Sequence, residues 1–144
     1  FFLISDEKKH NSYAQLLDVH LENSLATEEV LPKTKVFLAE NKLVIVDIDL
    51  VILGNNGDVN FDAYFQPLQQ DFKEIPQVYY KHLVGECYTA SAFGMQLGVK
   101  ILKSQHLPEA YRLNTVQPQK TIKKVLLYNQ FRGKNHSWIL LEHV

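Results

Sequence analysis

The stretch from Lys81 to Gly98 constrains the fold of this chain more than any other segment. It begins as a polar loop and then carries apolar residues at helical spacing, on one face (Ala90, Phe93, Gly94, Leu97 and Ile101). Gly94 and Gly98 lie one turn apart on that face. Each costs a helix roughly 1 kcal/mol relative to alanine, so we expect close packing against another backbone to compensate. The stretch predicts the buried central helix of a layered α/β domain. The loop before this helix is expected to face whatever functional site the domain has.

The order of the remaining segments predicts an α/β fold with a mixed sheet. Strands are expected at residues 1–5, 13–21, 43–53, 77–80, 123–128 and 137–143, and two further helices at residues 24–42 and 61–72. The resulting order, β-β-α-β-α-β-α-β-β, indicates a sheet with helices on at least one face. We find no internal repeat that would divide the chain, so residues 1–144 are expected to form one domain.

Composition narrows the class of protein. The chain has 144 residues, of which 46% are hydrophobic, which is enough for one globular core. No uninterrupted apolar run approaches the roughly 18 residues of a membrane helix. The single cysteine, Cys87, excludes an internal disulfide and is typical of a reducing compartment such as the cytoplasm. The chain opens at Phe1 in the middle of an apolar pattern, so we expect it to be part of a longer protein without a signal peptide here.

Charge is distributed unevenly along the chain. Residues 1–72 hold five Lys and twelve Asp or Glu (−7), whereas residues 73–144 hold ten Lys or Arg and four Glu (+6). A solvated dipolar surface explains this pattern most simply. The alternative is a basic surface that binds an acidic partner, for which the candidates are Arg112, Lys120, Lys123, Lys124, Arg132 and Lys134. No recognised nucleic-acid-binding motif accompanies these residues.

Two local motifs have catalytic interpretations that we do not favour. Asp47 and Asp49 resemble the aspartyl nucleophile motif of haloacid-dehalogenase-type phosphatases, in which paired carboxylates hold Mg²⁺ beside a phosphate. The matching second acidic motif, at Asp58 and Asp62, follows too closely along the chain, and the apolar strand continues where that motif should leave it. Polar residues leading into a buried strand are the simpler interpretation.

Cys87 is the second such case. It follows Glu86 near the start of the predicted helix, and His82 is the nearest base in the sequence. A helix N-terminus lowers a thiol pKa, but the adjacent carboxylate opposes thiolate formation. A small packing residue is the simpler interpretation. The six histidines show no metal-ligand spacing, and we expect neither a metal nor a cofactor.

Three segments taken together resemble the C-terminal half of a β-ketoacyl-acyl-carrier-protein synthase, a thiolase-like half-domain. The first is the turn after the strand ending at Leu53, where Asn55 stands in place of the first family histidine. The second is Tyr80 to Glu86, where Lys81 and Gly85 match the family and Glu86 replaces the second histidine. The third is Asn129 to Ser137, which is similar in outline to the glycine-rich closing turn between two strands.

The resemblance implies a thiolase-like fold and a degenerate active site at Asn55, Lys81 and Glu86. In this family the two histidines stabilise the thioester oxyanion and assist malonyl decarboxylation, and the nucleophilic cysteine belongs to the other half. Asn55 could still donate a hydrogen bond to an oxyanion, whereas an ionised Glu86 would repel it. Degenerate ketosynthases act as chain-length-factor subunits in fatty-acid, polyketide or aryl-polyene synthesis.

Three hypotheses remain open. The first is a chain-length-factor-type subunit, whose implied partners are a complete ketosynthase, in a dimer, and an acyl carrier protein. The second is a divergent condensing acyltransferase whose cysteine lies in an absent N-terminal half, with a raised pKa allowing Glu86 to donate a proton. The third is an isolated α/β binding domain with only a superficial resemblance to the family.

Overall fold

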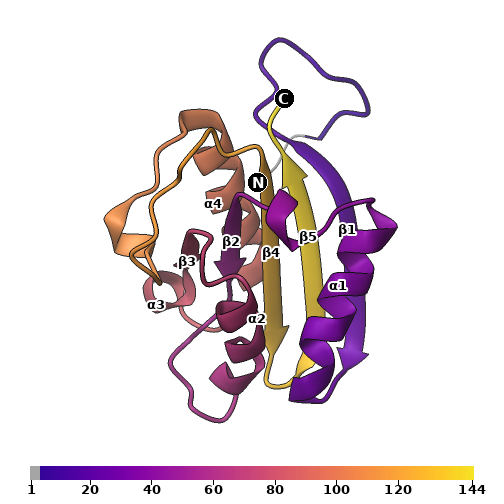
Figure 1. The fold of residues 1–144 in the computed structure, drawn as a ribbon, viewed down its shortest axis with the longest axis vertical. Helices are drawn as coiled ribbons and strands as arrows, with labels where there is room; N and C mark the ends of the chain where they lie inside the picture. Colours follow the sequence, from indigo (N-terminus) through magenta and orange to yellow (C-terminus); the bar gives the residue numbers. More distant parts are fainter. Residues whose placement is uncertain (1–3) are drawn as a thin grey trace.

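The computed structural model describes residues 4–144 and contains a five-stranded mixed sheet (Figure 1). The strands lie in the order β1-β5-β4-β2-β3. Strand β2 pairs in parallel with both β3 and β4, whereas β5 pairs antiparallel with β4 and β1. The predicted α/β fold with a mixed sheet is confirmed. The bounds are β1 Gln15–Ser24, β2 Leu50–Leu53, β3 Gln77–Tyr79, β4 Lys124–Phe131 and β5 Lys134–Glu142.

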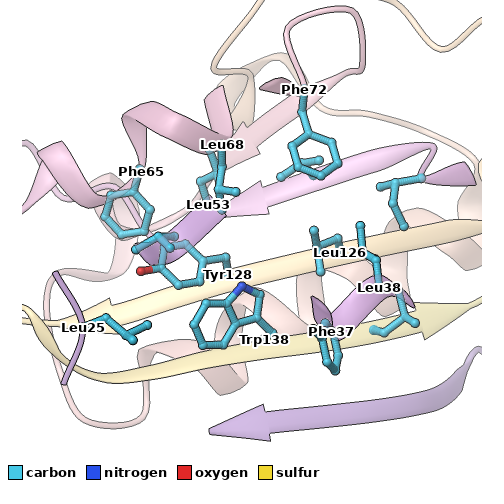
Figure 2. Close-up of a cluster of buried hydrophobic side chains, with 14 residues drawn as sticks. Leu25, Phe37, Leu38, Leu53, Phe65, Leu68, Phe72, Leu126, Tyr128 and Trp138 are labelled. Atoms are coloured by element: carbon cyan, nitrogen blue, oxygen red, sulfur yellow. The ribbon is translucent and has the colours of Figure 1, made fainter. Parts of the chain in front are cut away.

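Helices cover both faces of the sheet. Helices α1 (Val30–Glu40) and α2 (Gln66–Asp71) lie in front of the sheet in Figure 1, and α4 (Ala90–Ser104) lies behind it. The short helix α3 (Lys81–Val84) follows β3 directly. The front core packs aromatic and leucine side chains of α1 and α2 against Tyr128, Trp138 and their neighbours on the sheet (Figure 2). Single-turn 3₁₀ helices occupy Thr27–Glu29, Ile45–Asp47, Asp62–Tyr64 and Glu109–Tyr111.

Helix α4 is the predicted central helix, and its two glycines are buried against the sheet. A Cβ atom at Gly94 would lie 2.7 Å from Leu127 Cδ1 and 2.7 Å from Tyr80 Cε1, and one at Gly98 would lie 2.9 Å from Leu141 Cδ1. Close packing beside the two glycines is therefore present, but the expectation that another backbone approaches them is wrong. Side chains of the sheet and of Tyr80 fill the space instead.

The largest differences from the predicted elements lie in the first third of the chain. The expected strand at residues 1–5 falls mostly outside the described residues, and positions 4 and 5 are not in a strand. The expected long strand at residues 43–53 is reduced to β2, after a 3₁₀ turn. This turn is stabilised by the Asp47 carboxylate, which accepts a hydrogen bond of 2.8 Å from the Val44 N–H. Val44 and Val46 are exposed there, so the apolar run is not one buried strand.

The closing hairpin is tighter than its sequence indicated. We expected a seven-residue turn at residues 129–135, but β4 extends to Phe131 and β5 starts at Lys134. Arg132 and Gly133 form the loop, with φ values of 52° and 69°. Positive φ at both positions is the geometry of a type I′ hairpin turn. The register shifts between the pairs Asn129–Ser137 and Phe131–Lys134, so Gln130 of β4 lies opposite a β-bulge in β5 formed by Asn135 and His136.

Candidate functional site

The carboxyl ends of β2, β3 and β4 meet at one edge of the sheet, because these three strands run parallel. Gly54, Asn55 and Asn56 follow β2, Lys81 lies two residues beyond β3, and Gln130 lies near the end of β4. This edge is where open α/β sheets commonly bind ligands. The fold therefore brings the three segments of the family resemblance to one place.

Lys81 is the centre of this polar group. Its side chain is completely buried, and Nζ donates hydrogen bonds to Glu86 Oε2 at 2.8 Å and to the Gln130 carbonyl at 3.0 Å. Gln130 lies opposite the β-bulge of β5, where the pairing between β4 and β5 is irregular. Burial lowers the pKa of the Lys81 ammonium, and the Glu86 carboxylate opposes this shift. The buried cation is thus held by one carboxylate and one backbone dipole.

Glu86 accepts two hydrogen bonds at a single oxygen. Its Oε2 atom receives the Lys81 ammonium and also the Asn56 side-chain amide, whose Nδ2 lies 2.9 Å away. Its other oxygen, Oε1, is buried and has no hydrogen-bond partner among the described residues. The loop after β2 and the segment before α4 are therefore tied together through this carboxylate.

Asn55 is buried beside this group but uses its side-chain oxygen elsewhere. Its Oδ1 accepts a hydrogen bond of 3.3 Å from Gln69 Nε2 in α2. Within residues 4–144, no hydrogen bond joins Asn55 to Lys81 or Glu86. Of the three predicted site residues, the structure pairs Lys81 with Glu86 and places Asn55 on the neighbouring strand end.

Sequence reasoning missed four residues that complete the site, namely Asn56, Asn129, Gln130 and Tyr80. Asn56 and Gln130 provide the contacts described above. Asn129 Oδ1 and the Tyr80 hydroxyl are buried without a hydrogen-bond partner in the described chain. Two of the four, Asn129 and Gln130, stand in the closing-turn motif. Asn56 is the third residue after β2, and Tyr80 directly follows β3. A polar residue at the carboxyl end of each parallel strand was the signal that could have identified them.

Cys87 and His82 are not brought together as a catalytic pair. Cys87 is exposed, and its Sγ lies 3.6 Å from the Thr89 hydroxyl. The His82 ring stacks on Tyr79, with 3.9 Å between ring centroids, and its Nε2 lies 2.7 Å from the Ala110 carbonyl. Both side chains thus have local partners in this structure, as expected for residues outside a nucleophile–base pair.

Asp47 and Asp49 precede β2 and lie at the opposite edge of the sheet from Lys81. The Asp49 carboxylate accepts hydrogen bonds from the backbone N–H groups of Lys123 and Lys124, both at 2.9 Å, and pairs with Lys120 at 2.8 Å. Burial raises its pKa, but these hydrogen bonds outweigh burial and lower it overall. Asp49 therefore joins the starts of β2 and β4, which agrees with the structural interpretation of these carboxylates.

The other acidic motif also has a local structural role. The Asp62 carboxylate accepts hydrogen bonds from the backbone N–H groups of Asn56, at 3.1 Å, and Gly57, at 3.0 Å. These contacts hold the loop that presents Asn56 to Glu86. Among residues 4–144, no three His, Cys, Asp or Glu side chains are grouped as metal ligands.

The six basic residues proposed as a partner surface do not form one group. Lys120, Lys123 and Lys124 lie at the amino end of β4, whereas Arg132 and Lys134 lie at the hairpin turn beyond its other end. Arg112 is separate from both groups, and its backbone forms an isolated antiparallel β-bridge with Val78 of β3. Three of the six are ion-paired within the chain, namely Lys120 with Asp49, Lys124 with Glu142 and Arg112 with Glu109.

No helix in the described part of the chain is long and apolar enough to cross a membrane. No family model matches the sequence, and no curated protein matches it. Solved structures do match its fold. They include a β-ketoacyl synthase from Burkholderia phymatum STM815, with 16% identity over 92% of this chain and 38% of that chain and a TM-score of 0.64.

Two further matches are ketosynthases of polyketide synthesis. Ketosynthase twelve of the bacillaene synthase in Bacillus amyloliquefaciens has a TM-score of 0.67 and 13% identity, over 92% of this chain and 30% of that one. The second is a structure of a type II polyketide synthase acyl-carrier protein in complex with its ketosynthase bound to the hexaketide. It has a TM-score of 0.66 and 16% identity, over 92% of this chain and 39% of that one. The predicted resemblance and the thiolase-like ketosynthase fold are confirmed. The chain spans only 30–39% of the length of these matched structures.

Proposed function

We propose that this chain is a non-catalytic, chain-length-factor-type domain of a ketosynthase system for fatty-acid, polyketide or aryl-polyene synthesis. The observation that carries the proposal is the buried ion pair between Lys81 and Glu86, at the position where the family resemblance expects a histidine. The ketosynthase-like fold supports the same role.

The chemistry of this pair opposes condensation. Thioester condensation develops negative charge on a carbonyl oxygen, and enzymes stabilise that charge with hydrogen-bond donors aimed at it. Here the strongest donor, the Lys81 ammonium, already binds Glu86 and the Gln130 carbonyl. The free oxygen of Glu86 presents a further acceptor where a donor is needed. The Asn55 amide nitrogen alone would be a weak substitute for two histidines.

The alternative is a divergent condensing acyltransferase whose nucleophile lies on another segment. The observation that favours it is the presence of buried polar atoms without partners, the Tyr80 hydroxyl and Asn129 Oδ1. Such atoms usually have a partner in a complete structure. A substrate, or a residue from another part of the protein, could supply that partner.

The proposed partners are a complete ketosynthase and an acidic acyl carrier protein. One matched structure is itself a carrier protein in complex with its ketosynthase. In this chain, Arg132 lies in the hairpin turn near Gln130 and Lys134 directly follows the turn, so both lie on the same edge as the site. An acidic carrier protein that delivers its acyl group to this edge would meet these cations.

Acylation of the protein tests the two functions directly. We would incubate the full parent protein with acetyl-, malonyl- and octanoyl-acyl-carrier-protein and record its intact mass, with an active ketosynthase as the positive control. The proposal expects no acyl adduct. A covalent adduct on folded protein would contradict it and favour the condensing enzyme. A cysteine variant that abolishes the adduct would then identify the nucleophile.

A second arm tests the role of Glu86 in the same parent protein. Glu86→His, alone and together with Asn55→His, restores the residues that the resemblance expects. If these residues alone account for the loss of activity, the double variant of a parent that carries a nucleophile should gain condensation. The far-ultraviolet circular dichroism and melting temperature must match those of the unmodified protein. A folded double variant that stays inactive would show that the degeneracy extends beyond these two positions.

A further inference from the structure

The loop after β2 contains the sequence Asn56-Gly57, the only Asn-Gly pair in the chain. An asparagine side chain can cyclise when the backbone nitrogen of the next residue attacks its amide carbon. Glycine favours this reaction because it has no side chain to obstruct the attack, and asparagine is accordingly one of the thermolabile residues of proteins. In Figure 1 the loop extends below the end of β2 before the chain enters α2.

The conformation of the loop explains why a glycine follows Asn56. The φ angle of Gly57 is 84°, which residues with a side chain rarely adopt. The residue is exposed, and a Cβ atom built there would have no neighbour within 4 Å. Backbone conformation rather than packing therefore requires the glycine. The same open space admits the water that is needed to open a cyclised product.

The Asn56 carboxamide has two partners in the folded chain. Its Nδ2 donates a hydrogen bond of 2.9 Å to Glu86 Oε2, and its Oδ1 accepts one of 2.9 Å from the Asp58 N–H. The Asp58 contact draws electrons away from the amide carbon and stabilises the negative charge that attack would place on Oδ1. The folded loop thus activates the carbon at which cyclisation occurs.

The Asp62 carboxylate opposes the reaction at the attacking nitrogen. Its Oδ2 accepts a hydrogen bond of 3.0 Å from the Gly57 N–H, and its Oδ1 accepts one of 3.1 Å from the Asn56 N–H. Attack requires the Gly57 nitrogen to lose its proton, and a carboxylate beside it disfavours the resulting negative charge. The same two contacts restrain the backbone around the peptide bond between Asn56 and Gly57. Asp62 therefore holds the loop in its unreacted form.

We propose that Asn56 is a site of spontaneous deamidation, that Asp62 limits its rate, and that the product releases the loop from Glu86. The Gly57 nitrogen forms a bond to Asn56 Cγ, the bond from Cγ to Nδ2 breaks, and ammonia leaves with the proton of the Gly57 N–H. Water then opens the cyclic succinimide to give aspartate or isoaspartate at position 56. In both products a carboxylate stands where an amide now donates to Glu86.

This modification changes the charge at the centre of the site. Two carboxylates would occupy the place of one hydrogen-bonded pair, and like charges this close repel each other. The single charge of Lys81 does not neutralise both, because its Nζ is buried and already donates to Glu86 and to the Gln130 carbonyl. The contact that ties the loop after β2 to the segment before α4 should therefore be lost irreversibly as the protein ages.

Peptide mapping during storage tests the modification. We would incubate the chain at about pH 7.5 and 37 °C for about four weeks, and follow by digestion and mass spectrometry the gain of about 1 Da and the isoaspartate isomer. We expect slow conversion at Asn56. Asn60, which is exposed in the same loop and precedes the bulky Phe61, is the internal control and should stay intact. An unmodified Asn56 at the end of the incubation would overturn the proposal.

Variants of the loop test the role of Asp62. Asp62→Ala removes both backbone contacts and should accelerate conversion at least about fivefold, as expected for two lost hydrogen bonds. Asp62→Asn retains an acceptor oxygen and should be intermediate. The matched control is Asp58→Ala, whose lost carboxylate contacts only Asn60, and its effect should be less than twofold. Circular dichroism must show that each variant is folded. Equal acceleration in Asp58→Ala and Asp62→Ala would overturn the assignment to Asp62.

The consequence for the site is tested with a variant that reproduces one product. Asn56→Asp should speed amide hydrogen exchange in residues 54–61 at least about threefold, because the loop has lost its contact with Glu86. Adding Glu86→Gln to this variant restores a donor and an acceptor with their roles exchanged, and should return exchange toward its original rate. Unchanged exchange in Asn56→Asp would overturn the release of the loop.

Discussion

At the scale of single residues, the Lys81–Glu86 contact combines two different degrees of burial. The Lys81 side chain has no exposed surface, whereas the Glu86 side chain is 20% exposed. A charge left alone in the interior costs much more than one that water can still reach. The two partners should therefore be unequal in their effect on stability.

We predict that Glu86→Ala lowers the free energy of unfolding by about 3 kcal/mol at pH 7, because it leaves the Lys81 ammonium buried without its counterion. Lys81→Met should cost less, because the remaining carboxylate can be hydrated and Met fills the same space. Urea unfolding monitored by circular dichroism gives both values. The control is Asp71→Ala, which breaks an exposed pair with Lys35 and should cost less than about 1 kcal/mol. Equal, small losses at Lys81 and Glu86 would contradict the assignment.

His136 gives a second prediction, concerning pH. It is completely buried, with Nδ1 2.8 Å from the Tyr128 hydroxyl and Nε2 3.2 Å from the Gly133 carbonyl. In the neutral ring that burial favours, Nε2–H donates to the Gly133 carbonyl and Nδ1 accepts from the Tyr128 hydroxyl. Burial lowers the pKa of His136, and the hydrogen bond to Gly133 only partly opposes this.

The direction in which pH changes stability follows from the difference between the His136 pKa values of the folded and unfolded chains. The unfolded chain takes up a proton at His136 near pH 6.5, while the folded chain does so only at lower pH. Stability is therefore fully present above pH 6.5 and decreases as the pH falls from there through the lowered folded pKa, by up to about 1.4 kcal/mol per pH unit. Urea unfolding at pH 7.5, 6.5, 5.5 and 5 should show this slope. His136→Gln should remove it, and His143→Gln, at an exposed position, should retain it.

At the scale of secondary-structure elements, the packing of α4 depends on the space beside its glycines. We predict that Gly94→Ala destabilises the protein by about 1–2 kcal/mol. The new methyl group would overlap Leu127 and the ring of Tyr80, at a typical cost of 1–3 kcal/mol, and the gain in helix propensity of about 1 kcal/mol offsets only part of it. The melting temperature and urea midpoint measure the change. Gln96→Ala, at an exposed position of the same helix, should shift stability by less than about 0.5 kcal/mol.

Elements whose apolar residues recur at a clear helical spacing were predictable from the sequence. Elements whose bounds depend on contacts between distant or polar side chains were not. The sequence of residues 24–42 predicts a buried stripe on the helix, consisting of Val30, Leu31, Thr34, Phe37, Leu38 and Asn41. Four of the six are buried in α1 (Val30, Thr34, Phe37 and Leu38), whereas Leu31 and Asn41 are half-buried. Residues 43–53 looked like one strand because every apolar residue was read as buried. The Asp47 side chain instead closes a turn onto Val44, and composition alone cannot reveal that contact.

The candidate site was predictable in position but not in connectivity. The resemblance to ketosynthases identified Asn55, Lys81 and Glu86 as positions of one degenerate site. Their actual partners depend on the position of Gln130 near the end of β4 and on the loop held by Asp62, which bring the Gln130 carbonyl to Lys81 and Asn56 to Glu86. These contacts join residues up to 49 positions apart, and a one-residue shift in the β4 register would abolish the contact between Lys81 and the Gln130 carbonyl.

At the scale of the whole molecule, the basic residues occupy separate regions, and two groups lie at opposite ends of β4. The first, Lys120, Lys123 and Lys124, lies at the edge that holds Asp49. The second, Arg132 and Lys134, lies at the edge that holds Lys81. Eight strand residues separate the two groups by about 25 Å. This distance is well beyond the Debye length of ~8 Å at physiological ionic strength, so the two groups of exposed charges are largely screened from each other. A partner that binds one group is therefore largely insensitive to the other.

This separation makes the proposed carrier-protein contact testable by comparing the two ends. An acyl carrier protein that approaches the Lys81 edge should lose about 3- to 10-fold in affinity with Arg132→Glu or Lys134→Glu, mainly through slower association. Lys123→Glu introduces the same change in charge at the far end, so its effect should be less than twofold. Surface plasmon resonance at about 50 and 150 mM salt gives the rates, and the difference between the ends should shrink at the higher salt. Equal losses at both ends would indicate nonspecific attraction to net charge, and a loss only at Lys123 would place the carrier protein at the Asp49 edge.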